Sequence, residues 1–283
     1  MIVLMVFMFF LLGLIFGSFV NALVWRLRHR QLAKEGKGNK KLANKLFKAN
    51  SRSMCPNCEH TLSALDLIPV LSWCALRGRC KYCKKPISIQ YPLVELATAA
   101  IFSILYLCWP NQLQGFQWAL LVLWLLATVI FMAMALYDFK WMLLPDELMA
   151  PLLIVAIAVA GLTIVSSINP AHTAFNTFLA VMVGGSIFFV IFQLSGGKMI
   201  GGGDVKLGWI LGLMLGTAVN AMLMLFLAGL GGSLVALTLL LSGKLRRNSL
   251  IPFGPFLILG ALIAVLFGND ISSWYQNTFL LVN

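Results

Sequence analysis

Two aspartates stand at the ends of apolar stretches, where charge is costly if the stretches cross a membrane. Asp138 closes the run FQWALLVLWLLATVIFMAMALYD, and Asp204 follows three consecutive glycines. The chain has only nine acidic residues, so these positions indicate a functional site. Two adjacent carboxylates can share one proton: the ionised one acts as general base toward water, and the protonated one donates to a carbonyl oxygen. If helix packing brings Asp138 and Asp204 together, they form a pair suited to peptide hydrolysis.

Other assignments compete for these roles. Asp146 follows Pro145 in LLPDE, where we expect it to be the N-cap of the next helix, with Glu147 in the first turn. We therefore favour Asp138 over Asp146 as the partner of Asp204. The alternative for Asp204 is that it is itself an N-cap facing the cytoplasm. The glycines of SGGKMIGGGDVK fit the catalytic interpretation, because glycine lets a backbone approach a bound peptide closely.

Four cysteines form two C-x-x-C knuckles, CPNC and CKYC, with 21 residues between them. Thiolates from Cys55, Cys58, Cys80 and Cys83 can surround one zinc ion tetrahedrally. We place these residues in the reducing cytoplasm, so zinc or a similar thiophilic metal is favoured over disulfides or redox thiols. A loop with little core of its own would gain folding energy from the metal. Cys74 and Cys108 stand alone and are expected to be packing residues.

Two further features involve helix packing. Glu95 follows YPLV near the start of an apolar segment, so its carboxylate should face a polar interior or pair with a basic group. Gly13 and Gly17 have the small-xxx-small spacing that favours close approach of a second helix.

The elements that must position these residues are transmembrane helices. Hydrophobic residues make up 60% of the 283-residue chain and the mean hydropathy is +0.92, which excludes an ordinary soluble protein. The first stretch lacks a basic n-region and a cleavage site, so it is predicted to be a retained helix. We predict an all-α polytopic membrane protein, in which 205–241 could alternatively be one kinked helix. The roughly eight spans are expected at 2–24, 92–109, 116–137, 148–168, 176–194, 205–217, 219–241 and 252–268.

The basic residues predict the orientation. Of 21 lysines and arginines, 15 lie between Arg26 and Lys85, and the other six lie in every second connection. The positive-inside rule therefore places 26–90 and the connections at 138–147, 195–205 and 243–251 in the cytoplasm, with both termini outside. A basic rim facing anionic membrane lipids accounts for the net charge of +12, so we infer no nucleic-acid partner.

Six motifs follow one another along the chain: GLIFGSFVNALVWRL (13–27), the two knuckles with LIPVLSWCALRGRC between them, ISIQYPLVELATA (87–99), YDFKWMLLPDE (137–147), GGGDVKLGWILG (201–212) and IPFGPFLILG (251–260). In this order they resemble the motifs of the type IV prepilin leader peptidases, which are also N-methyltransferases and belong to the GxGD membrane aspartic proteases. The resemblance covers nearly the whole chain, whereas GxGD alone would be a weak signal. The Lys-rich insertion at about 28–52 is longer than the family pattern.

The resemblance implies that the chain cleaves the leader from prepilins or pseudopilins at the cytoplasmic face of the bacterial inner membrane. It also implies that the new N-terminal residue is methylated with S-adenosylmethionine. The family's catalytic aspartates fall on Asp138 and Asp204. Its metal ligands fall on Cys55, Cys58, Cys80 and Cys83.

On this basis we expect an N-terminal region at 1–110, a peptidase domain at 111–268 and an extracytoplasmic tail at 269–283. The methyltransferase part is assigned to the N-terminal region, where Glu95 is a candidate for the cofactor site. Two alternatives remain. One is a peptidase without methyltransferase activity, since no glycine-rich nucleotide motif follows a strand. The other is a proton-coupled transporter, which would predict inverted repeats that the sequence does not display.

Overall fold

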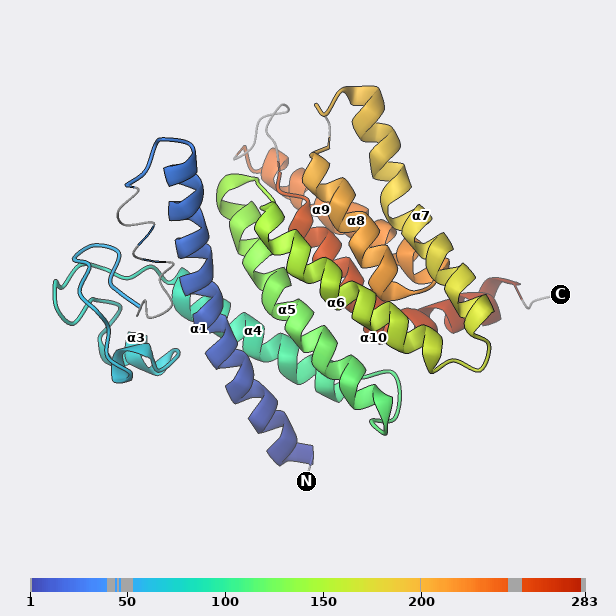
Figure 1. The fold of residues 1–283 in the computed structure, drawn as a ribbon, viewed down its shortest axis with the longest axis horizontal. Coiled ribbons are helices and arrows are strands. Elements are labelled where there is room, and N and C mark those ends of the chain that lie inside the picture. The colour runs from blue at the N-terminus through green and yellow to red at the C-terminus, as the bar shows by residue number, and fades with distance from the viewer. Residues whose placement is uncertain are drawn as a thin grey trace. The chain divides into compact units, whose positions relative to one another are not determined.

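A computed structural model describes residues 2–39, 44, 46, 53–198, 200–243 and 251–280. Their regular secondary structure is helical, and pairing between extended segments is limited to two isolated bridges in the cysteine loop (Figure 1). The predicted all-α fold is therefore confirmed. The chain divides into two compact units, Met1–Leu107 (unit 1) and Cys108–Asn283 (unit 2).

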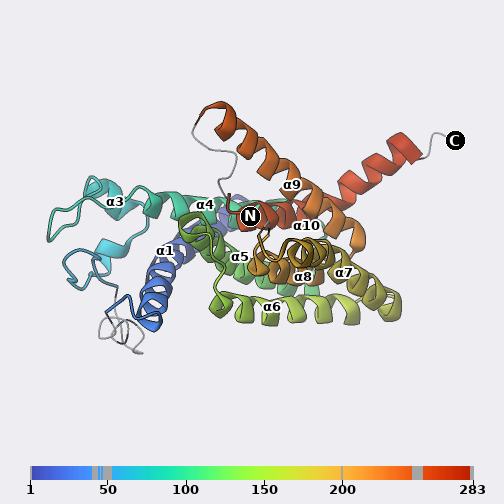
Figure 2. The same ribbon diagram turned by 90° about the horizontal axis from the view of Figure 1, so that it is seen from above.

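Unit 1 is built on two long helices, α1 (Ile2–Lys34) and α4 (Gln90–Leu107), which pack side by side (Figures 1 and 2). The predicted close approach at the two glycines of α1 is confirmed. A Cβ atom on Gly13 would lie 2.4 Å from Cα of Ala99, and one on Gly17 would lie 2.6 Å from Cα of Glu95. The loop between the helices carries two short elements, a 3-10 turn (Leu65–Leu67) and α3 (Leu71–Ala75).

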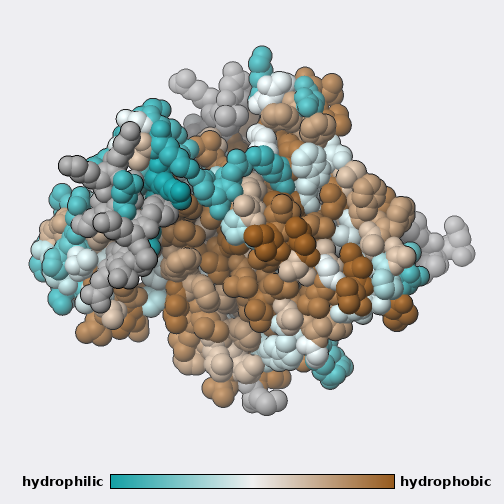
Figure 3. Space-filling model, in the orientation of Figure 1, coloured by the Kyte–Doolittle hydropathy of each residue, from teal (hydrophilic) through white to brown (hydrophobic). Residues whose placement is uncertain are grey.

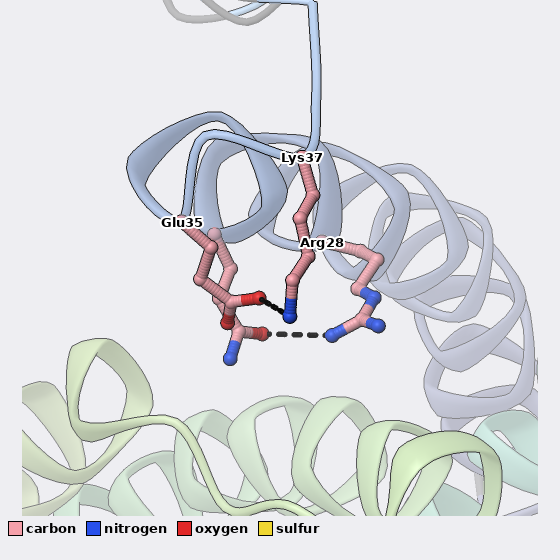
Figure 4. Close-up of polar contacts among 4 residues, drawn as sticks. Arg28, Glu35 and Lys37 are labelled. Atoms are coloured by element: carbon pink, nitrogen blue, oxygen red, sulfur yellow. Dashed lines mark hydrogen bonds and ion pairs between the residues drawn. The ribbon is translucent and has the colours of Figure 1, made fainter.

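Helix α1 continues well past residue 24, where we expected the first span to end. Its last turns carry polar contacts: Arg28 donates to the Gln31 side chain over 3.2 Å, and the exposed Lys37 and Glu35 form an ion pair of 3.5 Å just beyond the helix (Figure 4). Such exposed pairs contribute little to stability. Of the predicted Lys-rich insertion at 28–52, residues 40–43, 45 and 47–52 lie outside the described residues.

Unit 2 is a bundle in which α8 contacts α6, α7, α9 and α10, and α10 also contacts α5. Its C-terminal helix ends in a π-helical turn (Gln276–Leu280), so most of the tail expected at 269–283 is helical. The helices are α5 (Phe116–Trp141), α6 (Asp146–Val165), α7 (Pro170–Ser195), α8 (Gly202–Leu215), α9 (Ala218–Leu241) and α10 (Gly254–Tyr275).

Each of the eight predicted spans corresponds to a helix. Within the described residues, seven of these helices are long and apolar enough to cross a membrane; α8, with 14 residues, is the exception. A left-handed residue, Gly216 with φ of 70°, ends α8 before α9 begins, so the alternative of one kinked helix over 205–241 is wrong.

Small residues bring α8 against α7. A Cβ atom on Gly208 would lie 2.4 Å from the carbonyl oxygen of Gly184, and one on Gly212 would lie 2.4 Å from that of Ala180. Any side chain at these two positions would push the helices apart. This contact fixes the position of α8, and with it Asp204 in the first turn.

Candidate functional site

Asp138 lies near the C-terminal end of α5 and is only 5% exposed. Its Oδ2 atom accepts a hydrogen bond of 3.1 Å from the backbone N–H of Gly254, the first residue of α10. The unpaired N–H groups at a helix N-terminus carry partial positive charge and stabilise a nearby anion. The contact between α5 and α10 therefore provides a favourable environment for a carboxylate inside a helical bundle.

Asp204 lies in the first turn of α8 and is partly buried. Its own N–H donates to the carbonyl of Gly201 over 3.1 Å, and the backbone of Gly201 also hydrogen-bonds the carboxylate. The charge of Asp138 acts on the Asp204 carboxylate, so the two groups lie within electrostatic range of each other. Both aspartates are therefore candidates for one shared site: Asp138 contacts the N-terminus of α10, and Asp204 lies in the first turn of α8.

Leu144, in the turn between α5 and α6, packs against the backbone beside both aspartates. A Cβ atom on Gly203 would lie 2.9 Å from Leu144 Cβ, and one on Gly254 would lie 2.9 Å from Asp138 Oδ2 and 3.3 Å from Leu144 Cδ2. Neither glycine can gain a side chain without displacing Leu144 or a catalytic candidate. The two glycines thus keep the backbone close to the carboxylates.

Sequence reasoning missed the role of Gly254. The motif IPFGPFLILG was noted, but the residue is 116 positions from Asp138, and nothing in the local spacing shows that contact. Pro255 directly after the glycine is a signal for a helix start, which could have identified an N-terminus available to an acid.

Asp146 is not the N-cap that we expected. The N-cap position of α6 is Pro145, and Asp146 is the first helical residue. Its exposed side chain forms an ion pair of 2.6 Å with Lys206 Nζ, two positions after Asp204. The acid therefore connects the start of α6 to α8 at the surface. The start of α6 and the start of α8 lie at the same end of unit 2, the upper end in Figure 1.

The four knuckle cysteines in unit 1 come together as the spacing predicted. All four Sγ atoms lie within 4.8 Å of one another, and those of Cys55 and Cys83 are 4.0 Å apart. A tetrahedral zinc with Zn–S bonds of about 2.3 Å places its sulfurs about 3.8 Å apart, so the cluster fits a thiophilic metal ion. All six cysteines are free thiols, which contradicts the disulfide alternative.

The two knuckles repeat one backbone geometry. The N–H of Glu59 donates to the carbonyl of Cys55 over 2.9 Å, and the N–H of Lys84 donates to that of Cys80 over 3.0 Å. Glu59 and Lys84, each directly after the second cysteine, have φ of 54° and 59°. This shared turn directs both thiols of each knuckle to the same side, as a metal centre requires.

The thiols do not ionise equally. Burial raises the pKa of the Cys80 thiol, but backbone hydrogen bonds from Cys83 and Tyr82 outweigh it and lower this pKa to about 7. At Cys58 a backbone hydrogen bond from His60 lowers the pKa, but burial and the neighbouring thiols outweigh it and raise the pKa to about 11. Four thiolates at this spacing would repel one another, so a bound metal ion would offset that repulsion and release the protons of the thiols.

Glu95 is buried at the contact of α1 with α4, and its partners are neutral. Its Oε2 accepts the backbone N–H of Val70 over 2.7 Å, and the hydroxyl of Ser18 also hydrogen-bonds the carboxylate. Val70 has φ of 60° and ψ of −51° within a tight turn in which the N–H of Leu71 meets the carbonyl of Pro69 at 2.6 Å. This conformation is strained for a β-branched residue, so Glu95 stabilises a turn that would otherwise be unfavourable.

Two family models match the chain. Residues 11–109 match the bacterial peptidase A24 N-terminal domain, and residues 125–237 match the type IV leader peptidase family. The first match covers the knuckles and Glu95, and the second covers both aspartates.

Curated relatives align with almost the full length. A protein of Aeromonas hydrophila is 34% identical over 282 residues, covering 96% of this chain and 93% of its own, and one of Pseudomonas aeruginosa is 34% identical over 275 residues, covering 94% and 91%. Both are named prepilin leader peptidase/N-methyltransferase. A protein of Escherichia coli, 32% identical over 262 residues, is named type 4 prepilin-like proteins leader peptide-processing enzyme. No solved structure matches the chain significantly.

Proposed function

The chain belongs to the type IV leader peptidase family, and we propose that it cleaves the leader peptide of prepilins or pilin-like precursors and N-methylates the new N-terminal residue. The observation that supports this proposal is the proximity of Asp138 and Asp204: Leu144 packs against Gly254 beside one carboxylate and against Gly203 next to the other. Family membership favours this activity over the proton-coupled transporter.

In the proposed cleavage step, Asp138 and Asp204 share one proton. The ionised carboxylate takes a proton from a water molecule, which attacks the scissile carbonyl carbon, while the protonated carboxyl group donates to the carbonyl oxygen. The C–N bond then breaks, and the leaving amine receives a proton from the pair. The hydrogen bond from Gly254 holds Asp138 in place during these exchanges. Lys206 pairs with Asp146, which supports a structural role for that third acid.

The chain is a multi-pass membrane protein by its family and by the seven candidate spans among its described residues. Beyond this, we assign it to the bacterial inner membrane with the aspartates at the cytoplasmic face, because the basic connections predict that orientation. A precursor could then present its leader to the aspartates from the cytoplasm while its apolar helix stays in lipid.

We further propose that Cys55, Cys58, Cys80 and Cys83 hold one zinc ion. The spacing of their sulfur atoms and the paired turns support a closed structural site with no open coordination position. In this role zinc would supply folding energy to the loop of unit 1 and take no part in cleavage.

The methyltransferase activity is inferred from the shared name of the relatives. S-adenosylmethionine would supply an electrophilic methyl group for the amine that cleavage exposes. Glu95 remains our candidate within the methyltransferase region, but its carboxylate is engaged by Val70 and Ser18. This favours a positioning role for Glu95 over direct contact with the methyl donor.

A two-step assay tests the function. Purified protein in lipid nanodiscs is incubated with a prepilin, first alone and then with S-adenosylmethionine, and the products are weighed by mass spectrometry. Release of the leader in both reactions, with one added methyl group only in the second, is the expected result. Cleavage without methylation would leave the peptidase-only alternative, and an intact precursor in the presence of folded enzyme would contradict the proposal.

A further inference from the structure

The loop of unit 1 exposes large apolar side chains beside a short helix. Ile68, Leu71 and Ile89 are 40%, 68% and 61% exposed, although a loop expected in the cytoplasm should cover or avoid such groups. We call these three residues the α3 surface. Figure 3 shows hydrophobic surface gathered at the lower left, where α3 lies in Figure 1.

Helix α3 is fixed to the approach and first turns of α4. Besides the bond of 2.7 Å from Val70 to Glu95, Trp73 Nε1 donates to the carbonyl of Ile87 over 3.2 Å, and the N–H of Ile87 donates to the carbonyl of Gly78 over 2.7 Å. These bonds connect one end of the α3 segment to α4 and the other end to the residues that lead directly into α4. The depth of α4 in the membrane therefore determines the depth of α3.

The length of α4 gives a first measure of that depth. The helix has 18 residues, and at about 1.5 Å per residue it spans about 27 Å, slightly less than a hydrocarbon core of about 30 Å. Almost all of α4 is thus needed to cross. Glu95 lies five residues after Gln90, or about 7.5 Å from the start of the helix. The Val70 N–H that binds Glu95 is consequently below the surface of the bilayer.

Helix α1 gives a second, independent measure. Ser18 contacts the Glu95 carboxylate, and the first basic residue along α1 is Arg26. Eight residues of helix place Arg26 about 12 Å from the level of Ser18. Of the residues between them, only Asn21 is polar, and its amide is satisfied by the carbonyls of Gly17 and Tyr91. Val70 binds the same carboxylate as Ser18, so it lies deeper in the apolar part of the membrane than Arg26, the first basic residue of α1.

We propose that the α3 surface is embedded in the lipid bilayer at the cytoplasmic face, as a wedge held in place by Glu95. Burying Ile68, Leu71 and Ile89 in acyl chains removes the cost of exposing their apolar surface to water. The basic residues of the same loop follow α3 and suit anionic head groups: Arg77, Arg79, Lys81, Lys84 and Lys85. Trp73 has the amphipathic ring typical of a membrane interface.

The test uses a photoreactive phenylalanine analogue, p-benzoylphenylalanine, introduced singly at Leu71 or Ile68. The full-length protein is reconstituted in phosphatidylethanolamine and phosphatidylglycerol nanodiscs, irradiated, and analysed by mass spectrometry for covalent phospholipid. Leu93, an exposed residue of α4, provides the lipid-facing control, and Glu35, an exposed acid just beyond the end of α1, provides the water-facing control. Metal content verifies that each variant keeps a folded loop.

Phospholipid adducts at Leu71 and Ile68 comparable to those at Leu93, with none at Glu35, are the expected result. Adducts at Leu71 and Ile68 as scarce as those at Glu35 would overturn the proposal. Adducts to peptide alone, formed only when a prepilin is added, would also overturn it and assign the surface to the substrate helix. The readout requires no enzymatic activity, so failure of the proposed peptidase function would leave this test unaffected.

Discussion

The backbone N–H of Gly254 donates a hydrogen bond of 3.1 Å to Oδ2 of Asp138, which joins the start of α10 to the end of α5. A backbone donor cannot be lost by side-chain rotation, so this bond restrains the orientation of the carboxylate. Because α10 also contacts α8, the helix that carries Asp204, one element adjoins both halves of the proposed catalytic pair.

The first prediction concerns the two aspartates. Asn at Asp138 or Asp204 keeps the size of the side chain but cannot carry the shared proton. Each variant should lower the rate of prepilin cleavage by roughly 10²–10⁴-fold or more, because general acid–base catalysis contributes a factor of that size. Asp146→Asn is the matched control: it removes only an exposed ion pair worth about 0–1 kcal/mol and should retain most activity. An active Asp138→Asn together with an inactive Asp146→Asn, in prepilin cleavage assays, would refute the assignment.

The second prediction concerns the room beside Asp138. In Gly254→Ala the new Cβ would lie 2.9 Å from Asp138 Oδ2, so the carboxylate or Leu144 must move. We expect reduced kcat and a loss of about 1–3 kcal/mol in stability, as is usual for overpacking. Gly161→Ala in α6, where a Cβ meets nothing within 4 Å, should leave activity unchanged. Equal kinetics for the two variants would show that the Gly254 contact does not position Asp138.

The sequence predicted much of this arrangement, and what it missed has a physical cause. The run of apolar residues and the flanking charges were enough to predict the helices, and the C-x-x-C spacing was enough to predict the thiol cluster. The Gly254–Asp138 and Val70–Glu95 hydrogen bonds join residues that are distant in the chain. Their donors are backbone N–H groups, which nearly every residue type has, so no sequence pattern indicates them. We expected Asp146 at the N-cap of α6, but Pro145 occupies that position and the helix begins one residue earlier, at Asp146.

The third prediction concerns the metal. Purified protein should contain about one zinc per chain, since four thiolates complete a closed site. Ser at Cys55 or Cys83 should lose the metal and make the loop of unit 1 sensitive to protease. Cys108→Ser is the control and should keep the metal, because this residue lies outside the cluster. Elemental analysis that finds no metal in reduced, active protein would contradict this prediction.

The fourth prediction separates two roles for Glu95. Glu95→Ala leaves the N–H of Val70 without its acceptor, at a cost of about 1–3 kcal/mol, and should loosen α3 and impair methylation. Glu95→Gln retains a carbonyl oxygen for the same bond, so a positioning role predicts nearly normal methylation. Methyl transfer to a pre-cleaved pilin is the measurement, with prepilin cleavage as the parallel readout. Should Glu95→Gln abolish methylation in a stable protein, the negative charge itself would be required near the methyl donor.

The last prediction tests whether both aspartates lie at one membrane face. Asp146 and Lys198 are exposed residues close in sequence to Asp138 and Asp204, and the positive-inside rule places both in the cytoplasm. Asn169, the N-cap of α7, and Asn277, beyond α10, should face the opposite side. Single cysteine reporters, compared with the parent chain as the baseline for its native thiols, should react with an impermeant maleimide from the predicted side only. Labelling of the Asp146 and Lys198 reporters from opposite sides would separate the carboxylates across the bilayer and exclude a shared catalytic site.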